Sequence, residues 1–240
     1  MTGLLRRQVP AAFDRGASAY DRLVGANPGY HAHLRRSARS FGFAEAGAGA
    51  RLLDAGCGTG ASTAALLAAA PRARVVGVDA SAGMLAEARA KPWPATVEFV
   101  HGRIEDLAGA GVTGPFDGIF AAYLVRNLPD PDATLDSLRA LLRPGGLLVV
   151  HDYSVRDSAA ARLVWHAVCW TVIIPAGRLL TGDAGLYRYL WRSALDFDEP
   201  GAFADRLRSA GFADVRTGTV SGWQKGIVHA FRGRRPEERP

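Results

Sequence analysis

The chain has 240 residues, of which 48% are hydrophobic and 22% are charged. This balance excludes an intrinsically disordered chain and is typical of a folded domain that can bury a core with a ligand cleft. The 29 basic and 23 acidic residues give a net charge of +6, but almost all of the bases are arginines scattered along the chain. Nucleic-acid binding needs a clustered basic patch, so we expect no nucleic-acid partner.

The cysteine and histidine pattern indicates neither a disulfide framework nor a metal site. Only Cys57 and Cys169 are present, and no spacing of histidines and cysteines matches a set of metal ligands. The first residues turn polar too early for a signal peptide. The longest run without charge, residues 163–177, is shorter than the roughly 20 apolar residues of a membrane span. We therefore expect a cytoplasmic protein without a transmembrane segment.

The first two thirds of the chain alternate between short apolar runs and amphipathic segments. Residues 1–45 are expected to be a helical N-terminal cap segment, and the alternation begins after it. Strands are predicted at residues 51–55, 74–79, 97–101, 116–122 and 146–152. Helices are predicted at residues 30–43, 61–70, 81–90 and 132–142, with Ser81 as an N-cap. Strands that alternate with helices predict a parallel sheet with helices on both faces.

The pattern changes after the fifth predicted strand. Residues 159–180 form a long, mostly apolar helical stretch, followed by a predicted helix at 200–210 and strands at 212–220 and 225–231. Residues 154–198 are therefore expected to be an insertion that caps a substrate pocket, within a main domain covering residues 46–240. The stretch 159–180 packs against the sheet in one interpretation. In the other it is a lid for a prenyl tail or a surface that touches a bilayer transiently.

The most informative motif is LDAGCGTG at residues 53–60. A predicted strand runs into a glycine-rich turn and then a helix, where glycines allow a ligand to approach the backbone and helix-end amides favour an anionic group. Its Gly-x-Gly-x-Gly spacing differs from that of dinucleotide-binding proteins. Asp79 ends the next predicted strand, where a carboxylate can accept hydrogen bonds from both hydroxyls of a ribose. The motif and Asp79 together predict a site for a nucleoside-containing cofactor.

These residues resemble the signature of class I S-adenosylmethionine-dependent methyltransferases. AFDR (12–15) with YD (20–21), YLVRN (123–127), LRPGG (142–146) and YRYL (187–190) make the chain similar to the ubiquinone/menaquinone biosynthesis C-methyltransferase family from about residue 12 to 231. The resemblance implies a Rossmann-like, seven-stranded, mostly parallel α/β sheet whose last strand is antiparallel. It also implies S-adenosylmethionine as cofactor, S-adenosylhomocysteine as product and an aromatic or quinol substrate with or without a lipid tail. A homodimer is compatible with the sequence.

The same resemblance assigns roles to individual residues. Asp54 and the loop that follows it would hold the methionine part of the cofactor, Asp79 the ribose, and Met84 would pack near the adenine. The full set of cofactor-binding candidates is Tyr20, Asp54, Gly56, Cys57, Gly58, Thr59, Gly60, Asp79, Ala80, Met84, Gly102, Arg103, Ile104 and Ala121. The substrate-binding candidates are Tyr123, Leu124, Trp165, Tyr187, Tyr189 and Trp223.

The catalytic candidates are Arg126, Asn127 and His151. Methylating a ring carbon needs an electron-rich ring, and a fixed cation beside the developing phenolate lowers the barrier. Arg126 can supply that charge and Asn127 a hydrogen bond, although a salt bridge from Arg126 to Asp130 or Asp132 is the structural alternative. His151 ends the fifth predicted strand, where it could accept a phenolic proton or be a packed histidine.

Three departures from the family pattern keep other functions open. Leu124 stands in place of a glycine, Arg103 in place of an acid that reads the adenine, and Trp223 is added near the C-terminus. They motivate an O- or C-methyltransferase of a specialised metabolite with His151 as base. A third alternative, from another class, is a cyclase or isomerase that binds S-adenosylmethionine without transferring its methyl group.

Overall fold

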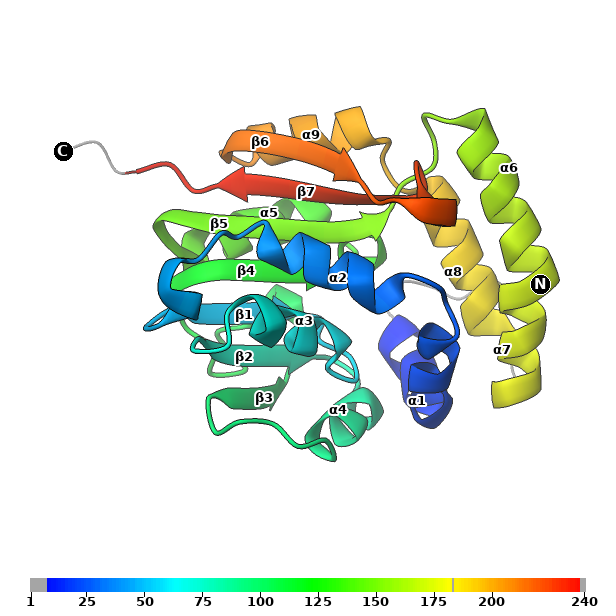
Figure 1. The fold of residues 1–240 in the computed structure, drawn as a ribbon, viewed down its shortest axis with the longest axis horizontal. Coiled ribbons are helices and arrows are strands. Elements are labelled where there is room, and N and C mark those ends of the chain that lie inside the picture. Colours follow the sequence, from blue (N-terminus) through cyan, green and yellow to red (C-terminus); the bar gives the residue numbers. More distant parts are fainter. Residues whose placement is uncertain (1–7, 183, 238–240) are drawn as a thin grey trace.

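The structure, a computed structural model, describes residues 8–182 and 184–237, so the first seven residues, where no signal peptide is expected, lie outside it. Its centre is a seven-stranded sheet in the order β3-β2-β1-β4-β5-β7-β6 (Figure 1). The strands are β1 (Arg51–Ala55), β2 (Arg74–Asp79), β3 (Val97–His101), β4 (Phe116–Ala122), β5 (Leu142–Tyr153), β6 (Ala213–Thr219) and β7 (Val228–Arg234). β7 alone runs in the direction opposite to that of the other strands. The predicted sheet is confirmed.

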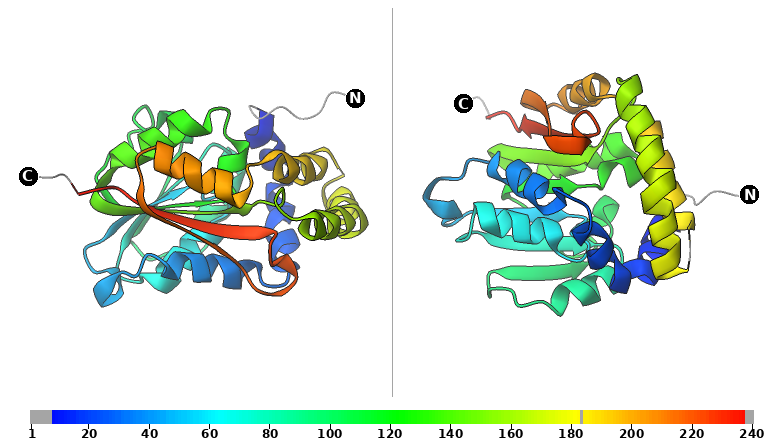
Figure 2. Two further views of the ribbon diagram at one scale, coloured as in Figure 1. Left: turned by 90° about the horizontal axis from the view of Figure 1, so that it is seen from above. Right: turned by 45° about the vertical axis from the view of Figure 1, so that its right-hand side comes forward.

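Helices cover both faces of this sheet, as the top view in Figure 2 shows. The α-helices are α1 (Val9–Gly25), α2 (Tyr30–Arg39), α3 (Ala61–Ala69), α4 (Ala82–Arg89), α5 (Pro131–Leu141), α6 (Ala159–Val168), α7 (Ile174–Thr181), α8 (Gly185–Asp196) and α9 (Pro200–Ser209). Short helical turns occur at Ala44–Gly47, Ile104–Asp106, Val125–Asn127, Cys169–Ile173 and Gly222–Gln224. Ser81 caps α4 as predicted, because its hydroxyl accepts the N–H of Met84.

The core lies in two layers because successive side chains of a strand point to opposite faces. On β4, Ile119 belongs to the cluster that includes side chains of α5 and α9, whereas Phe120 belongs to the cluster that includes α2 and α3. Leu148 and Val149 of β5 divide in the same way. Burial on both sides explains why these strands read as continuous apolar runs.

The insertion after β5 forms a helical wall across the carboxyl ends of the strands (Figure 2). α6 and α7 join into one helix through a π-helical turn, Cys169–Ile173, placed just before Pro175. Proline lacks an N–H and crowds the carbonyl of the preceding turn, and the wider π-turn accommodates it without a break. The sequence therefore predicted one long helix correctly, but not the π-turn within it.

This long helix changes one expectation. Of the residues that the structure describes, one helix, Ala159–Thr181, is long and apolar enough to cross a membrane, with a mean hydropathy of 1.5. The longest run without charge underestimated the length of this apolar helix, because the run stops at Arg162 and Arg178 although the residues beyond them are apolar too. Trp165, Cys169 and Ile174 are buried on its inner side, so one face of this helix packs against the domain while most of the helix stays unburied.

Candidate active site

A cavity of about 530 Å³ opens beyond the carboxyl ends of β1, β2 and β4, where ligands bind in open parallel sheets. α1 and the α6–α7 helix close it on the outer side, and its volume falls in the range of ligand-binding sites. The predicted site residues that line it are Tyr20, Gly56, Cys57, Gly58, Thr59, Asp79, Ala80, Met84, Arg103, Ile104, Tyr123, Leu124, Arg126, Asn127, Tyr187 and Trp223. The predicted site residues that do not line the cavity are Asp54, Gly60, Gly102, Ala121, His151, Trp165 and Tyr189.

The glycine-rich loop after β1 is held by the carboxylate of Asp79. One oxygen of Asp79 accepts the backbone N–H of Gly58 and the other that of Ser81, both at 2.8 Å. Burial raises the pKa of Asp79, against the lowering effect of these two donors. Gly60 has a φ of 92°, and a Cβ there would collide with the ring of Trp93. The loop therefore needs glycine at this position.

Asp54 lies behind this loop. Its Oδ2 accepts the hydroxyls of Ser62 and Thr63 at 2.8 and 2.6 Å, from the first turn of α3. Its Oδ1 is buried and has no hydrogen-bond partner among the described residues. Burial raises the pKa of Asp54 to about 7, although the two hydroxyls oppose the rise. Asp54 is thus a buried carboxyl one layer away from the cavity surface.

Two carboxylates of α1 hold this helix over the side of the cavity that carries the glycine-rich loop. Asp21 accepts the Thr59 hydroxyl at 2.5 Å and pairs with Lys91 at 2.5 Å. Asp14 accepts the hydroxyl of Ser81 at 2.6 Å and the N–H of Gly83 at 2.8 Å, at the start of α4. Asp14 and Asp21 were not predicted as site residues. Their seven-residue spacing, two helical turns on one face, was the signal available in the sequence.

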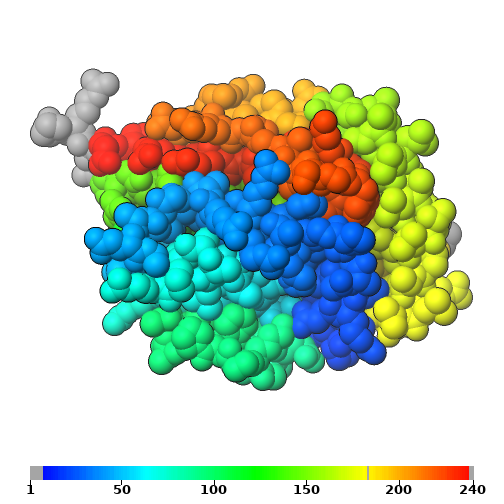
Figure 3. All heavy atoms as spheres, in the orientation of Figure 1, coloured from blue at the N-terminus to red at the C-terminus, as the bar shows by residue number. Residues whose placement is uncertain are grey.

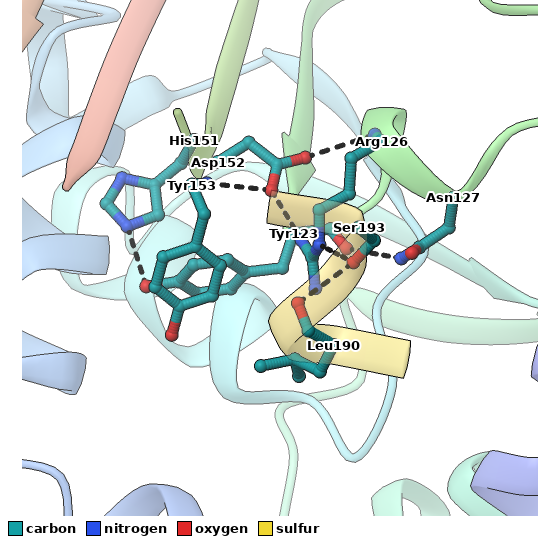
Figure 4. A network of polar contacts seen from close by, with 8 residues as sticks. All are labelled: Tyr123, Arg126, Asn127, His151, Asp152, Tyr153, Leu190 and Ser193. Carbon is teal, nitrogen blue, oxygen red and sulfur yellow. Dashed lines mark hydrogen bonds and ion pairs between the residues drawn. The ribbon is translucent and has the colours of Figure 1, made fainter. Parts of the chain in front are cut away.

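Arg126 is held at the cavity wall by a buried ion pair with Asp152, the last residue but one of β5 (Figure 4). Neither Asp130 nor Asp132 pairs with it: Asp130 caps α5, and Asp132 pairs with Arg206. Arg126 Nε also donates to the hydroxyl of Ser193 at 3.1 Å.

The guanidinium of Arg126 stays protonated and therefore keeps its positive charge. Burial alone would lower the pKa of Arg126, but the charge and hydrogen bond of Asp152, together with Tyr153 and Tyr189, outweigh burial and the pKa is raised. The group also lies over the rings of Tyr123 and Tyr153, at 5.8 and 5.3 Å from their centroids. Arg126 is therefore a fixed cation beside a pair of aromatic rings whose centroids lie 4.8 Å apart.

His151 sits behind Tyr123 (Figure 4). Its Nε2 hydrogen-bonds to the Tyr123 hydroxyl at 3.1 Å, and its Nδ1 to the hydroxyl of Ser37 at 2.8 Å. Burial, with His33 and His229 nearby, lowers the pKa of His151 to about 3. The side chain is fully buried, so the geometry supports the packed-histidine interpretation and a contact with Tyr123 in place of one with substrate.

Asn127 and Leu124 complete the wall near the glycine-rich loop. Asn127 Nδ2 donates to the carbonyl of Tyr123 at 3.0 Å, whereas its Oδ1 is buried without a hydrogen-bond partner among the described residues. A Cβ on Gly56 would lie 3.0 Å from Leu124 Cδ1. Leu124 therefore covers the loop and narrows the cavity, and Asn127 offers a free acceptor.

The remaining candidates divide between the cavity and the core. Arg103 pairs with Glu105 at 3.1 Å, and both line the cavity. Trp223 lines it too and donates to the carbonyl of Pro28 at 3.3 Å. Trp165 is instead fully buried, with its ring 4.6 Å from that of Tyr153.

Cys57 of the cavity lining is poorly suited to act as a nucleophile. Burial raises the pKa of its thiol and so disfavours a nucleophilic thiolate. Within residues 8–182 and 184–237, no group of three histidine, cysteine or acidic side chains could hold a metal ion.

Solved structures share this fold across nearly the whole chain. The [4+2]-cyclase SpnF matches with a TM-score of 0.71 and 18% identity, over 99% of both chains. A S-adenosylmethionine-dependent methyltransferase from Thermotoga maritima, described as a possible histamine N-methyltransferase, matches with a TM-score of 0.66 and 19% identity, over 95% of this chain and 99% of that one. At these identities the likeness concerns the fold alone.

Sequence relatives are more specific. The chain is 37% identical over 187 residues to a ubiquinone/menaquinone biosynthesis C-methyltransferase UbiE of Bradyrhizobium diazoefficiens, covering 76% of this chain and 72% of that one. It is 34% identical over 233 residues to a demethylmenaquinone methyltransferase of Clavibacter sepedonicus, covering 97% and 92%. The family model described as ubiE/COQ5 methyltransferase family matches residues 1–234. The chain therefore belongs to the ubiE/COQ5 methyltransferase family.

Proposed function

We propose that this methyltransferase transfers the methyl group of S-adenosylmethionine to a ring carbon of a hydroquinone or related phenol. The observation that carries the proposal is the fixed cation Arg126, which lines the same cavity as the glycine-rich loop and Asp79. The names of the two relatives, which act in menaquinone or ubiquinone formation, agree with a quinol substrate. The likeness to a cyclase does not favour cyclisation, because it concerns the fold only.

The residues of the loop side fit S-adenosylmethionine. Asp79 would hold the ribose, and Met84 and Ile104 offer apolar contacts for the adenine. The backbone of Gly58 would face the methionine part, because a Cβ there would meet open space. Arg103 cannot accept a hydrogen bond from the adenine amino group, so we assign that acceptor role to the neighbouring Glu105. When bound, the cofactor supplies an electrophilic methyl group on a positively charged sulfur.

The residues of the substrate side would activate and orient the ring. Arg126 stabilises the negative charge that a phenolic oxygen carries as its proton is lost. The unpartnered Oδ1 of Asn127 accepts a hydrogen bond from the second hydroxyl. The stacked rings of Tyr30 and Tyr123, 5.5 Å apart, exclude water from one side of the cavity. Alignment of two bound reactants is the main source of acceleration for such a transfer.

The test is incubation with S-adenosylmethionine carrying a labelled methyl group and a short-chain demethylmenaquinol, followed by mass spectrometry. We expect the label on a ring carbon, and none on the matched dimethyl ether, whose oxygens cannot ionise. A label on oxygen would overturn the assignment of the acceptor atom. Absence of S-adenosylhomocysteine with every quinol and phenol in a panel would overturn methyl transfer to this substrate class.

His151 gives a separate prediction, on pH dependence. Because its pKa is about 3, the imidazole stays neutral from pH 5 to 9, and its ionisation should not appear in the pH profile of kcat. His151→Gln should lower kcat only about two- to tenfold, through a less well oriented Tyr123 hydroxyl, and leave the profile unchanged. An acidic limb near pH 6 that disappears in His151→Gln would restore His151 as the general base.

We propose a cytoplasmic location for this protein, in keeping with the sequence-based expectation.

A further inference from the structure

The outer face of the α6–α7 helix is the main exposed apolar surface of the described residues. Among the described residues, every large hydrophobic side chain that is exposed lies on this one helix. They are Leu163, Val164, Trp170, Val172, Leu179 and Leu180. Leu163 is 71% exposed and Leu179 86%. In Figure 3 this helix, in yellow-green to yellow, forms the right-hand edge of the molecule. A concentrated apolar surface of this kind usually marks a binding site.

The charged side chains on this helix are basic. The helix Ala159–Thr181 contains no acidic residue, and its only charged side chains, Arg162 and Arg178, are exposed. α8 beside it contributes the exposed Arg188. An apolar face that carries tryptophan and is flanked by arginines is the pattern of a helix lying in the interface of an anionic bilayer.

The same helix forms part of the cavity wall. Val164 and Val172 are 41% and 57% exposed and also line the cavity. Val168, Ile173 and Ala176 line it from the inner side of the helix. An apolar surface therefore runs from outside the molecule into the cavity.

We propose that this helix docks the protein on an anionic bilayer surface, with the apolar face inserted among the lipids. A lipid-tailed acceptor could then enter the cavity along Val164 and Val172 without crossing water. The docking itself is independent of the proposed function, whereas this delivery route rests on it. A second copy of the chain fits the face less well, because a two-fold contact centred on the helix would bring Arg162 and Arg178 close to like charges.

The experiment is sedimentation of the full chain with vesicles of phosphatidylcholine, with and without phosphatidylglycerol. We expect the wild type to bind the anionic vesicles and to lose most binding in high salt. Ala167→Glu lies on the face between Leu163 and Trp170 and should lower the bound fraction about tenfold. The matched control, Ala133→Glu, changes an exposed alanine on α5 and should bind like the wild type.

Three outcomes would overturn the docking: no binding of the wild type to anionic vesicles, equal binding of Ala167→Glu, or a dimer in sedimentation that Ala167→Glu dissociates. Turnover of a tail-less hydroquinone should be the same in wild type and Ala167→Glu. If the wild type fails to methylate that soluble acceptor, the proposed function fails whatever the vesicles show. If it succeeds and the vesicles are not bound, only the docking fails.

Discussion

Replacing Arg126 with methionine is expected to lower the free energy of unfolding by about 3–5 kcal/mol, because it leaves the carboxylate of Asp152 buried without its partner. The side chains of Arg126 and Asp152 are 2% and 0% exposed, so water cannot replace the lost contact. Urea unfolding measures the change. The double variant Arg126→Met with Asp152→Asn should recover at least half of the loss, since no buried charge remains.

The double variant separates the contribution of Arg126 to the stability of the fold from its contribution to catalysis. If Arg126 stabilises the developing phenolate, the refolded double variant should still have a kcat at least about 100-fold below that of the wild type, the cost of removing one such donor. Asp152→Asn alone keeps the cation and is the control. A double variant that is both stable and active would show that the ion pair serves only the fold.

The strands on the side of the sheet that carries the glycine-rich loop could be predicted, because the residues that indicate each strand lie within it or directly beside it. β1, β2, β3 and β4 begin and end where the sequence predicted, each a short apolar run between turn residues. β5 begins earlier than predicted, at Leu142, although Pro144 and Gly145 ordinarily disfavour a strand. Leu142 pairs with Phe116 before a register shift, and only the fold shows that this irregular stretch continues the sheet.

The partners of the catalytic candidates depend on contacts between distant elements. Arg126 follows β4 and Asp152 lies near the end of β5, and they meet because Ala122 pairs with His151 across these strands. Nearby Asp130 and Asp132 were the candidates that sequence distance suggested. The burial of His151 on the α2 side of the sheet could have been inferred from the alternation along β5. Val149 faces α2, and a residue two positions further along a strand points to the same face.

Replacing Asp54 with asparagine is expected to stabilise the cofactor-free protein at pH 8. The pKa of Asp54 rises from 3.8 to about 7 on folding, so the folded state favours the protonated carboxyl. The associated stability is present below about pH 4 and is lost as the pH rises through 7. Asparagine mimics the protonated form, so it should gain up to about 4 kcal/mol at pH 8 and almost nothing at pH 4.

Urea unfolding of both proteins at pH 4, 6 and 8 measures this difference, with the exposed Asp136→Asn on α5 as a control for the loss of an aspartate. His151, whose pKa is lowered to about 3, makes stability rise with pH over part of the same window. It is present in both proteins, so it cancels in the comparison. Curves that run parallel at every pH would show that Asp54 is ionised without cost. The gain should be accompanied by weaker binding of S-adenosylmethionine, because the negative charge of Asp54 behind the glycine-rich loop attracts a cationic ligand in the cavity.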